Sequence, residues 1–245
     1  MNRRRGGTRK AAGRTVFEAW SPVSGRLRVV DVAGERRLIV AGETLSVYPL
    51  SGDWSRIRRE YWWRALDGLA LPPRLTALFV GLGGGTQIHL LRDVVSPRLV
   101  TVIERDPLVV RVARDWFGLR SLAGVRVLGG DAEVVIPHLA RARRRFQLVV
   151  EDASYADGAE RALPLLRALV RLVSPQGTLV VNCHYRRDAR LVAAEMARFF
   201  RDVTQRRVRR QGENVVVRCL GRRSSPRPGR RAARAGAQSV ERSVV

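Results

Sequence analysis

Residues 78–85 read Leu-Phe-Val-Gly-Leu-Gly-Gly-Gly, and residues 99–104 read Leu-Val-Thr-Val-Ile-Glu. This order predicts a buried strand, a glycine turn, a helix and a second strand that ends on Glu104. Glycines after a strand let the backbone approach a ligand without a Cβ in the way. An acid about 20 residues further on accepts hydrogen bonds from ribose hydroxyls. The stretch therefore predicts a nucleoside-binding α/β domain.

The spacing of the glycines distinguishes between two kinds of nucleoside. The dinucleotide pattern G-x-G-x-x-G requires a glycine at its sixth position, where this chain has Thr86. Gly81, Gly83 and Gly85 instead satisfy the form G-x-G-x-G, which is used by S-adenosylmethionine enzymes. We therefore expect these three glycines and Glu104 to bind a sulfonium nucleoside rather than NAD.

Strand-like and helix-like stretches alternate from residue 76 onward. Strands are expected near residues 77–80, 99–104, 125–128, 146–151 and 178–182, and helices near 86–95, 107–117, 132–144, 159–173 and 187–200. The runs 203–208 and 215–220 predict a closing hairpin. This pattern predicts a mostly parallel sheet with helices on both faces and antiparallel strands at one edge.

The chain before this sheet has a different pattern. Short apolar runs at residues 27–31, 36–40 and 44–48 predict a small antiparallel β extension over residues 15–52. Asp53 is expected to cap a helix that runs to about Leu69, because apolar residues recur there at i, i+4 spacing. The main domain is then expected over residues 53–220, between basic tails at 1–14 and 221–245.

Three acids follow three of the predicted strands. Glu104 ends the second strand, Asp131 follows the third and Asp152 follows the fourth. Carboxyl ends of parallel strands share one edge of the sheet, where ligands of such folds bind. The three acids are therefore expected to face one crevice. For Asp131 the alternative is a helix cap ahead of Ala132.

Composition and charge limit the class of protein. At 245 residues and 45% hydrophobic, the chain can bury one main core. The net charge is +24, and each predicted tail carries +6 of it without an aromatic residue. We expect disordered tails with at most non-specific nucleic-acid contacts. Cys183 and Cys219 are isolated and the histidines are scattered, which predicts a metal-free, reduced, cytoplasmic protein. The apolar runs are short, so we expect no segment that crosses a membrane.

Four motifs resemble those of the spermidine synthase family of polyamine aminopropyltransferases, over a region from about Arg26 to Leu220. They are Val-Gly-Leu-Gly-Gly-Gly-Thr at 80–86, Val-Ile-Glu-Arg-Asp-Pro at 102–107, Gly-Gly-Asp-Ala at 129–132 and Val-Val-Glu-Asp-Ala-Ser-Tyr at 149–155. The resemblance implies a Rossmann-like domain of the class I methyltransferase type behind a small N-terminal β domain. It also implies binding of decarboxylated S-adenosylmethionine.

The same resemblance implies roles for individual residues. Glu104 would hold the ribose, and Asp131 with the adjoining Ala132 would hold the adenine. Asp152 would orient and deprotonate the attacking amine. The sequence does not identify that amine, which we expect to be a small molecule.

The chain departs from the family pattern at three places. Gly84 stands where the family's glycine loop carries an acid, and residues 58–60, Arg-Arg-Glu, stand at the family's Tyr-x-Glu. The family's Asp-Ser-Ser-Asp becomes Asp152-Ala153-Ser154-Tyr155, so Tyr155 is expected to line the acceptor pocket in place of a second acid. Without an acid at Gly84, intact S-adenosylmethionine is also accommodated.

Three functions remain open on the sequence alone. The first is aminopropyl transfer to a small amine, and the second is methyl transfer from S-adenosylmethionine on the same scaffold. The third is nucleoside binding without catalysis. A homodimer is also left open, because the β extension and the aromatic run Tyr61-Trp62-Trp63 offer a surface to bury.

Overall fold

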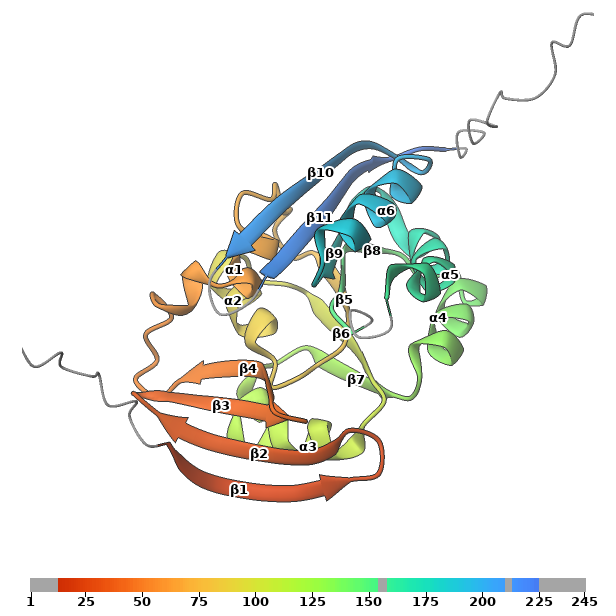
Figure 1. Cartoon of the computed structure of the whole chain (residues 1–245). Helices are drawn as coiled ribbons and strands as arrows, with labels where there is room; N and C mark the ends of the chain where they lie inside the picture. The colour runs from red at the N-terminus through yellow and green to blue at the C-terminus, as the bar shows by residue number, and fades with distance from the viewer. Residues whose placement is uncertain (1–12, 154–157, 210–212, 225–245) are drawn as a thin grey trace, which may run out of the picture.

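The computed structural model describes residues 13–153, 158–209 and 213–224. Two β-sheets organise the chain, a small one at the N-terminus and a larger one that carries the helices (Figure 1). The predicted disorder of the tails falls on residues 1–12 and 225–245, which lie outside the described residues. Both predicted tails are too long at their inner ends, because Arg14 belongs to the first strand and Arg222 to the last.

The small sheet has four antiparallel strands in chain order. They are β1 (Arg14–Ser21), β2 (Gly25–Val32), β3 (Glu35–Val40) and β4 (Glu43–Pro49). The sequence predicts the last three and misses β1. Among the described strands β1 pairs only with β2, and half of its residues are exposed, so it lacks a clear apolar alternation. The hydroxyl of Ser21 at its end donates to the buried carboxylate of Asp106 at 2.6 Å and ties the two sheets together.

A continuous helix over residues 53–69 is a wrong expectation. The structure has a short 3₁₀ helix, η1 (Ile57–Arg59), and a separate helix, α1 (Tyr61–Leu66). Glu60 between them is extended, with φ −87° and ψ 169°, which interrupts helical hydrogen bonding. Asp53 accepts a hydrogen bond from the Ser55 amide at 2.9 Å, so its carboxylate closes a local turn instead of capping a long helix.

The larger sheet has seven strands in the order β10-β11-β9-β8-β5-β6-β7. Its parallel strands are β5 (Thr76–Val80), β6 (Leu99–Glu104), β7 (Val125–Gly129), β8 (Phe146–Glu151) and β9 (Val173–Cys183). The antiparallel edge is formed by β10 (Phe200–Arg209) and β11 (Glu213–Arg222). Because the chain leaves β5 toward β6 and later returns to β8 on its other side, strand order reverses at the β5–β8 pair.

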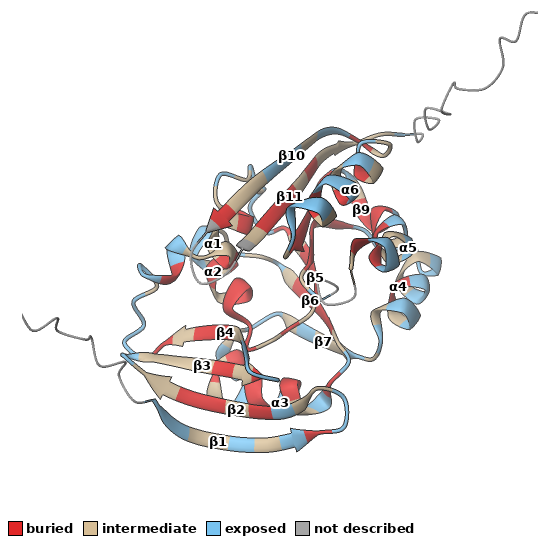
Figure 2. Cartoon of the chain, in the orientation of Figure 1, coloured by how far each residue is buried: buried red, intermediate tan, exposed pale blue. Residues whose placement is uncertain are grey.

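Five longer helices accompany this sheet: α2 (Thr86–Val94), α3 (Pro107–Trp116), α4 (Ala132–Arg141), α5 (Ala159–Val170) and α6 (Arg186–Met196). Two clusters of buried apolar side chains lie on opposite faces of the larger sheet. Ala77 and Phe79 of β5 belong to the cluster with α2, α3 and the small sheet, while Leu78 and Val80 belong to the cluster with α4, α5 and α6. Figure 2 shows the central strands of the larger sheet mainly buried and the outer surfaces of α4, α5 and α6 exposed. The predicted fold class, a Rossmann-like α/β domain with an N-terminal β extension, is confirmed.

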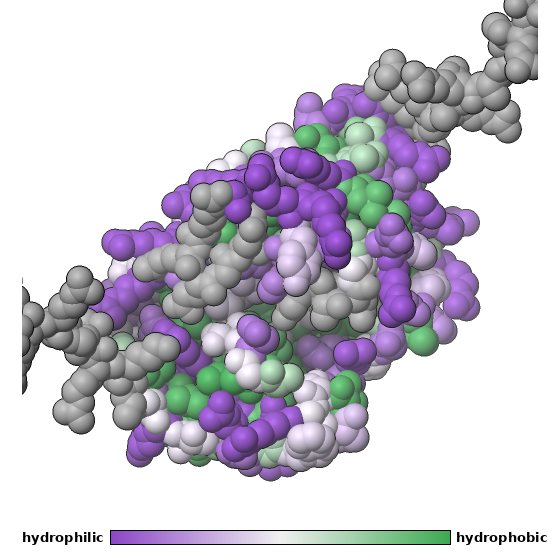
Figure 3. Space-filling view, viewed as in Figure 1, coloured by the Kyte–Doolittle hydropathy of each residue, from purple (hydrophilic) through white to green (hydrophobic). Residues whose placement is uncertain are grey.

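Strand β10 is an edge of the larger sheet. Its Arg201 is exposed, and Arg206 is paired with Asp67 at 3.1 Å. In Figure 3 hydrophilic residues gather over this strand. Charged side chains of this kind discourage an open strand from pairing with another chain.

Candidate nucleoside and catalytic site

The glycine loop leaves β5 at the point where strand order reverses. Gly81 has φ +92°, and a Cβ added there would lie 3.1 Å from the backbone oxygen of Asp152. Gly83 and Gly85 also have positive φ. The loop therefore passes closely beside the residues that follow β8, which only glycine permits. This brings Gly81, one of the three predicted ligand-binding glycines, next to the predicted catalytic acid.

Gly84 is enclosed on two sides. A Cβ added to it would lie 2.6 Å from Cδ1 of Phe117 and 3.0 Å from Cβ of Ser46. Its amide donates to the Ser46 hydroxyl at 2.7 Å, and Ser46 lies on β4 of the small sheet. A larger side chain at Gly84 would require these neighbours to shift. The small sheet thus holds the glycine loop directly.

Glu104 lies at the end of β6, beside the same loop. The amides of Leu82 and Asp106 donate to its two carboxylate oxygens, at 3.0 and 2.9 Å. Burial raises the pKa of Glu104 above its ordinary value, and the hydrogen bonds partly oppose this. An acceptor group thus stands where the sequence predicts the ribose contact, although the contact itself stays a prediction.

Asp131 and Ala132 lie after β7, at the same edge of the sheet. Asp131 is exposed and accepts a hydrogen bond from the Glu133 amide at 2.8 Å, as the N-cap of α4. Ala132 is the first residue of that helix. The structure therefore contains the helix cap that the sequence offers as the alternative for Asp131. Adenine binding by this pair stays a prediction.

Asp152 follows β8 and is held by two side chains. Asn182 Nδ2 donates to its Oδ1 at 2.7 Å, and the Tyr61 hydroxyl donates to its Oδ2 at 3.1 Å. The pKa of Asp152 is raised to about 7, mainly by burial and also by the charge of Glu151, while the two hydrogen bonds oppose the increase. A carboxyl group with this pKa exchanges protons readily at neutral pH.

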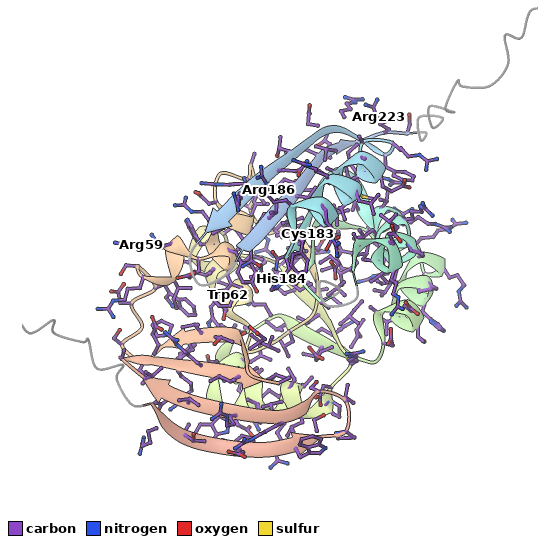
Figure 4. All side chains as sticks on the ribbon, in the orientation of Figure 1. Arg59, Trp62, Cys183, His184, Arg186 and Arg223 are labelled. Carbon is purple, nitrogen blue, oxygen red and sulfur yellow. The ribbon has the colours of Figure 1, made fainter. Side chains whose placement is uncertain are left out.

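The sequence misses three residues of this site. Asn182 lies near the carboxyl end of β9, so an amide at that position was a usable signal. In the sequence Tyr61 stands out only as part of an aromatic run, and nothing links Ser46 to a loop 38 residues away. Figure 4 places Trp62 and His184 between the small sheet and the carboxyl end of β9. The predicted acceptor residue Tyr155 lies outside the described residues.

Within residues 13–153, 158–209 and 213–224, no group of three or more His, Cys, Asp or Glu side chains is arranged to hold a metal ion. No helix in the same ranges is both long and apolar enough to cross a membrane.

Comparisons with curated proteins give two kinds of relative. An eEF1A lysine and N-terminal methyltransferase from Danio rerio is 33% identical over 118 residues, which are 44% of this chain and 17% of that protein. A polyamine aminopropyltransferase from Vibrio vulnificus is 28% identical over 131 residues, which are 52% of this chain and 44% of that protein. The chain thus spans less than half the length of these relatives. No family model matches.

Solved structures give the same two kinds of neighbour. The spermidine synthase from Thermotoga maritima aligns over 85% of this chain and 73% of its own, with a TM-score of 0.65 and 13% identity. Human methyltransferase-like protein 13, solved with SAH, aligns over 64% of this chain and 76% of its own, with a TM-score of 0.53 and 23% identity. Identities this low show the fold alone. The chain thus resembles spermidine synthases, and its larger sheet has the Rossmann-like fold of methyltransferases.

Proposed function

We propose that this chain is a transferase whose donor is S-adenosylmethionine or its decarboxylated form, and that it transfers an aminopropyl group to a small amine. The observation that carries the proposal is the half-buried carboxyl group of Asp152. It lies beside the glycine loop, held by Tyr61 and Asn182, with a pKa of about 7. The likeness to spermidine synthases, which extends over 85% of the chain, supports aminopropyl transfer as the reaction.

The proposed reaction requires no metal. A sulfonium makes its attached carbons electrophilic, so the protein has to align a nucleophile and remove one proton. The amine nitrogen forms a bond to the donor carbon, the carbon–sulfur bond breaks, and sulfur keeps that electron pair as a neutral thioether. Ionised Asp152 takes the proton that the nitrogen loses. Tyr61 and Asn182 fix the direction of the carboxylate through one hydrogen bond to each oxygen.

The donor in this proposal lies between the glycine loop and the ends of β6 and β7. Glu104 accepts from the ribose hydroxyls, while Asp131 and Ala132 contact the adenine. Backbone groups of Gly81, Gly83 and Gly85 approach the nucleoside closely because no Cβ intervenes. Tyr155 completes the acceptor pocket as a proposal from the sequence.

Methyl transfer is the second candidate, and Gly84 favours it. An acid at this position would repel the carboxylate of intact S-adenosylmethionine, but the contacts of Gly84 with Phe117 and Ser46 leave no space for one. The 33% identity to a methyltransferase supports the same candidate. The two donors differ by that carboxylate, so the choice of donor separates the two reactions.

The test offers both donors to the purified full chain, together with putrescine, monoamines and neutral nucleophiles. Mass spectrometry of the products distinguishes an added aminopropyl group from an added methyl group. Titration calorimetry with both donors and methylthioadenosine runs in parallel. Binding without transfer to any acceptor supports a non-catalytic nucleoside-binding protein, and binding of none of the three contradicts the nucleoside site.

Other expectations also remain proposals. A reduced, cytoplasmic location is supported by Cys183 and Cys219, which are free, buried thiols. Homodimer formation and non-specific nucleic-acid contacts through the basic tails are further proposals. Gel filtration with light scattering tests the first of these, and salt-dependent oligonucleotide binding tests the second.

A further inference from the structure

A cavity of about 640 Å³ lies at the carboxyl ends of β6 and β7 and is also lined by residues of α3. Pro107, Val110 and Val127 give it an apolar lining. Glu104 and the pair Gly129–Gly130 also line it, so the cavity adjoins the candidate donor site. Its volume lies within the range of roughly 300–1,000 Å³ that is usual for small-molecule sites.

The rest of the lining is strongly cationic. Four arginines contribute to it: Arg105, Arg111, Arg114 and Arg120. Arg111 and Arg120 share one acid, Asp115, at 3.9 and 2.6 Å, and both arginines are 69% exposed. Within the part of the chain that the structure describes, Arg105 and Arg114 make no ion pair. Four guanidinium groups are therefore opposed by two carboxylates, those of Asp115 and Glu104.

The chemistry of this lining selects a class of ligand. Guanidinium groups present paired N–H donors that match the oxygens of a phosphate. Apolar side chains and glycine backbone suit a planar ring. We propose that the cavity binds a nucleoside polyphosphate, with its base against the apolar lining and its phosphates at the arginines of α3 and the following turn. A pocket of this volume holds one nucleotide and favours a mononucleotide over a nucleic-acid strand.

This binding site goes beyond the proposed transfer reaction and has a consequence for it. Glu104 lines the cavity and contacts the ribose in the proposed donor site, and Gly129–Gly130 directly precede Asp131, so a bound nucleotide competes with the donor. The Glu104 carboxylate repels phosphate close to itself, which places the phosphates toward Arg111 and Arg114. The competition rests on the proposed function, whereas nucleotide binding does not.

Titration calorimetry of the full chain with ATP, adenosine and pyrophosphate at fixed ionic strength tests the proposal. ATP is expected to bind at least about tenfold more tightly than adenosine, and pyrophosphate is expected to bind measurably. Arg114→Gln should weaken ATP roughly tenfold through loss of a charge-assisted hydrogen bond, and leave adenosine unchanged. The matched control is Arg126→Gln, because Arg126 precedes Val127 on β7 and points to the opposite face of the strand.

Three results would overturn the proposal. The first is ATP that binds no more tightly than adenosine, and the second is an equal loss in Arg114→Gln and Arg126→Gln. The third is a short single-stranded oligonucleotide that binds more tightly than ATP and is itself weakened by Arg114→Gln. Failure of the transfer proposal is recognised separately. If ATP binds as expected but neither sulfonium donor nor methylthioadenosine binds or competes, the transferase assignment fails while the nucleotide site stands.

Discussion

The two sides of the candidate site hold their acids in different ways. On the donor side, Glu104 receives both of its hydrogen bonds from backbone amides no more than 22 residues away. On the acceptor side, Asp152 receives its bonds from side chains 91 and 30 residues away, Tyr61 and Asn182. Burial raises the pKa of both acids. Glu104 is thus held from within one continuous stretch of chain, whereas Asp152 is held by side chains from distant elements.

The largest expected effect is at the acceptor side. If Asp152 is the base, Asp152→Asn keeps its shape but cannot take a proton, so turnover should fall by ~10²–10⁴-fold while donor affinity is largely kept. Steady-state kinetics with the best donor and acceptor measure the first quantity, and calorimetry measures the second. The control is Asp202→Asn, an exposed carboxylate on β10. Equal activity of the two variants would remove Asp152 from the mechanism.

Substitution of Glu104 on the donor side should change the affinity for the nucleoside. Glu104→Ala removes a charged acceptor for ribose hydroxyls, worth ~1.5–3 kcal/mol, and should weaken methylthioadenosine roughly ten- to hundredfold. Because Glu104 also accepts from the Leu82 amide, circular dichroism must show that the variant is folded. Glu104→Gln, which keeps an acceptor oxygen, should lose less affinity. Glu18→Ala on the small sheet serves as control, and an unchanged dissociation constant in folded Glu104→Ala contradicts the ribose contact.

This difference also explains what could be predicted from the sequence. Alternating strands and helices, the glycine loop and Glu104 are local patterns, and the larger sheet matches the expectation closely. The expected long helix fails at Glu60, where the backbone becomes extended although the apolar spacing continues. Ser46 and Tyr61 reach the site only through tertiary packing. No local pattern encodes contacts of that kind.

A smaller effect concerns stability and its dependence on pH. The pKa of Asp152 is raised from 3.8 to about 7, so the folded state binds this proton more tightly than the unfolded state. The resulting stabilisation is complete below 3.8 and is lost as pH rises through about 7. Asp152→Asn should therefore be more stable than the wild type at pH 8, by about 1–2 kcal/mol, since partial exposure reduces the effect.

Urea denaturation of both proteins at pH 8 and at pH 4 measures this difference. The gain should shrink at the lower pH, where the wild-type carboxyl group is protonated as well. Asp202→Asn should show no comparable gain at either pH. A variant that is equally destabilised at both pH values would show that the Asp152 carboxylate is not strained by burial.

The smallest expected effect tests how Tyr61 acts on Asp152. Its hydroxyl bonds to the ionised carboxylate at 3.1 Å, which lowers the pKa of Asp152 against the larger effect of burial. Tyr61→Phe removes that bond, so the pKa should rise by roughly one unit. Activity requires ionised Asp152 and is lost as pH falls. The acidic limb of the pH profile of kcat/KM should therefore move to higher pH by the same amount. Tyr48 is packed against Trp54, and the control substitution Tyr48→Phe should leave the acidic limb of the pH profile in place. A Tyr61→Phe profile that is lowered uniformly without moving would assign Tyr61 to packing of the acceptor side rather than to the proton transfer.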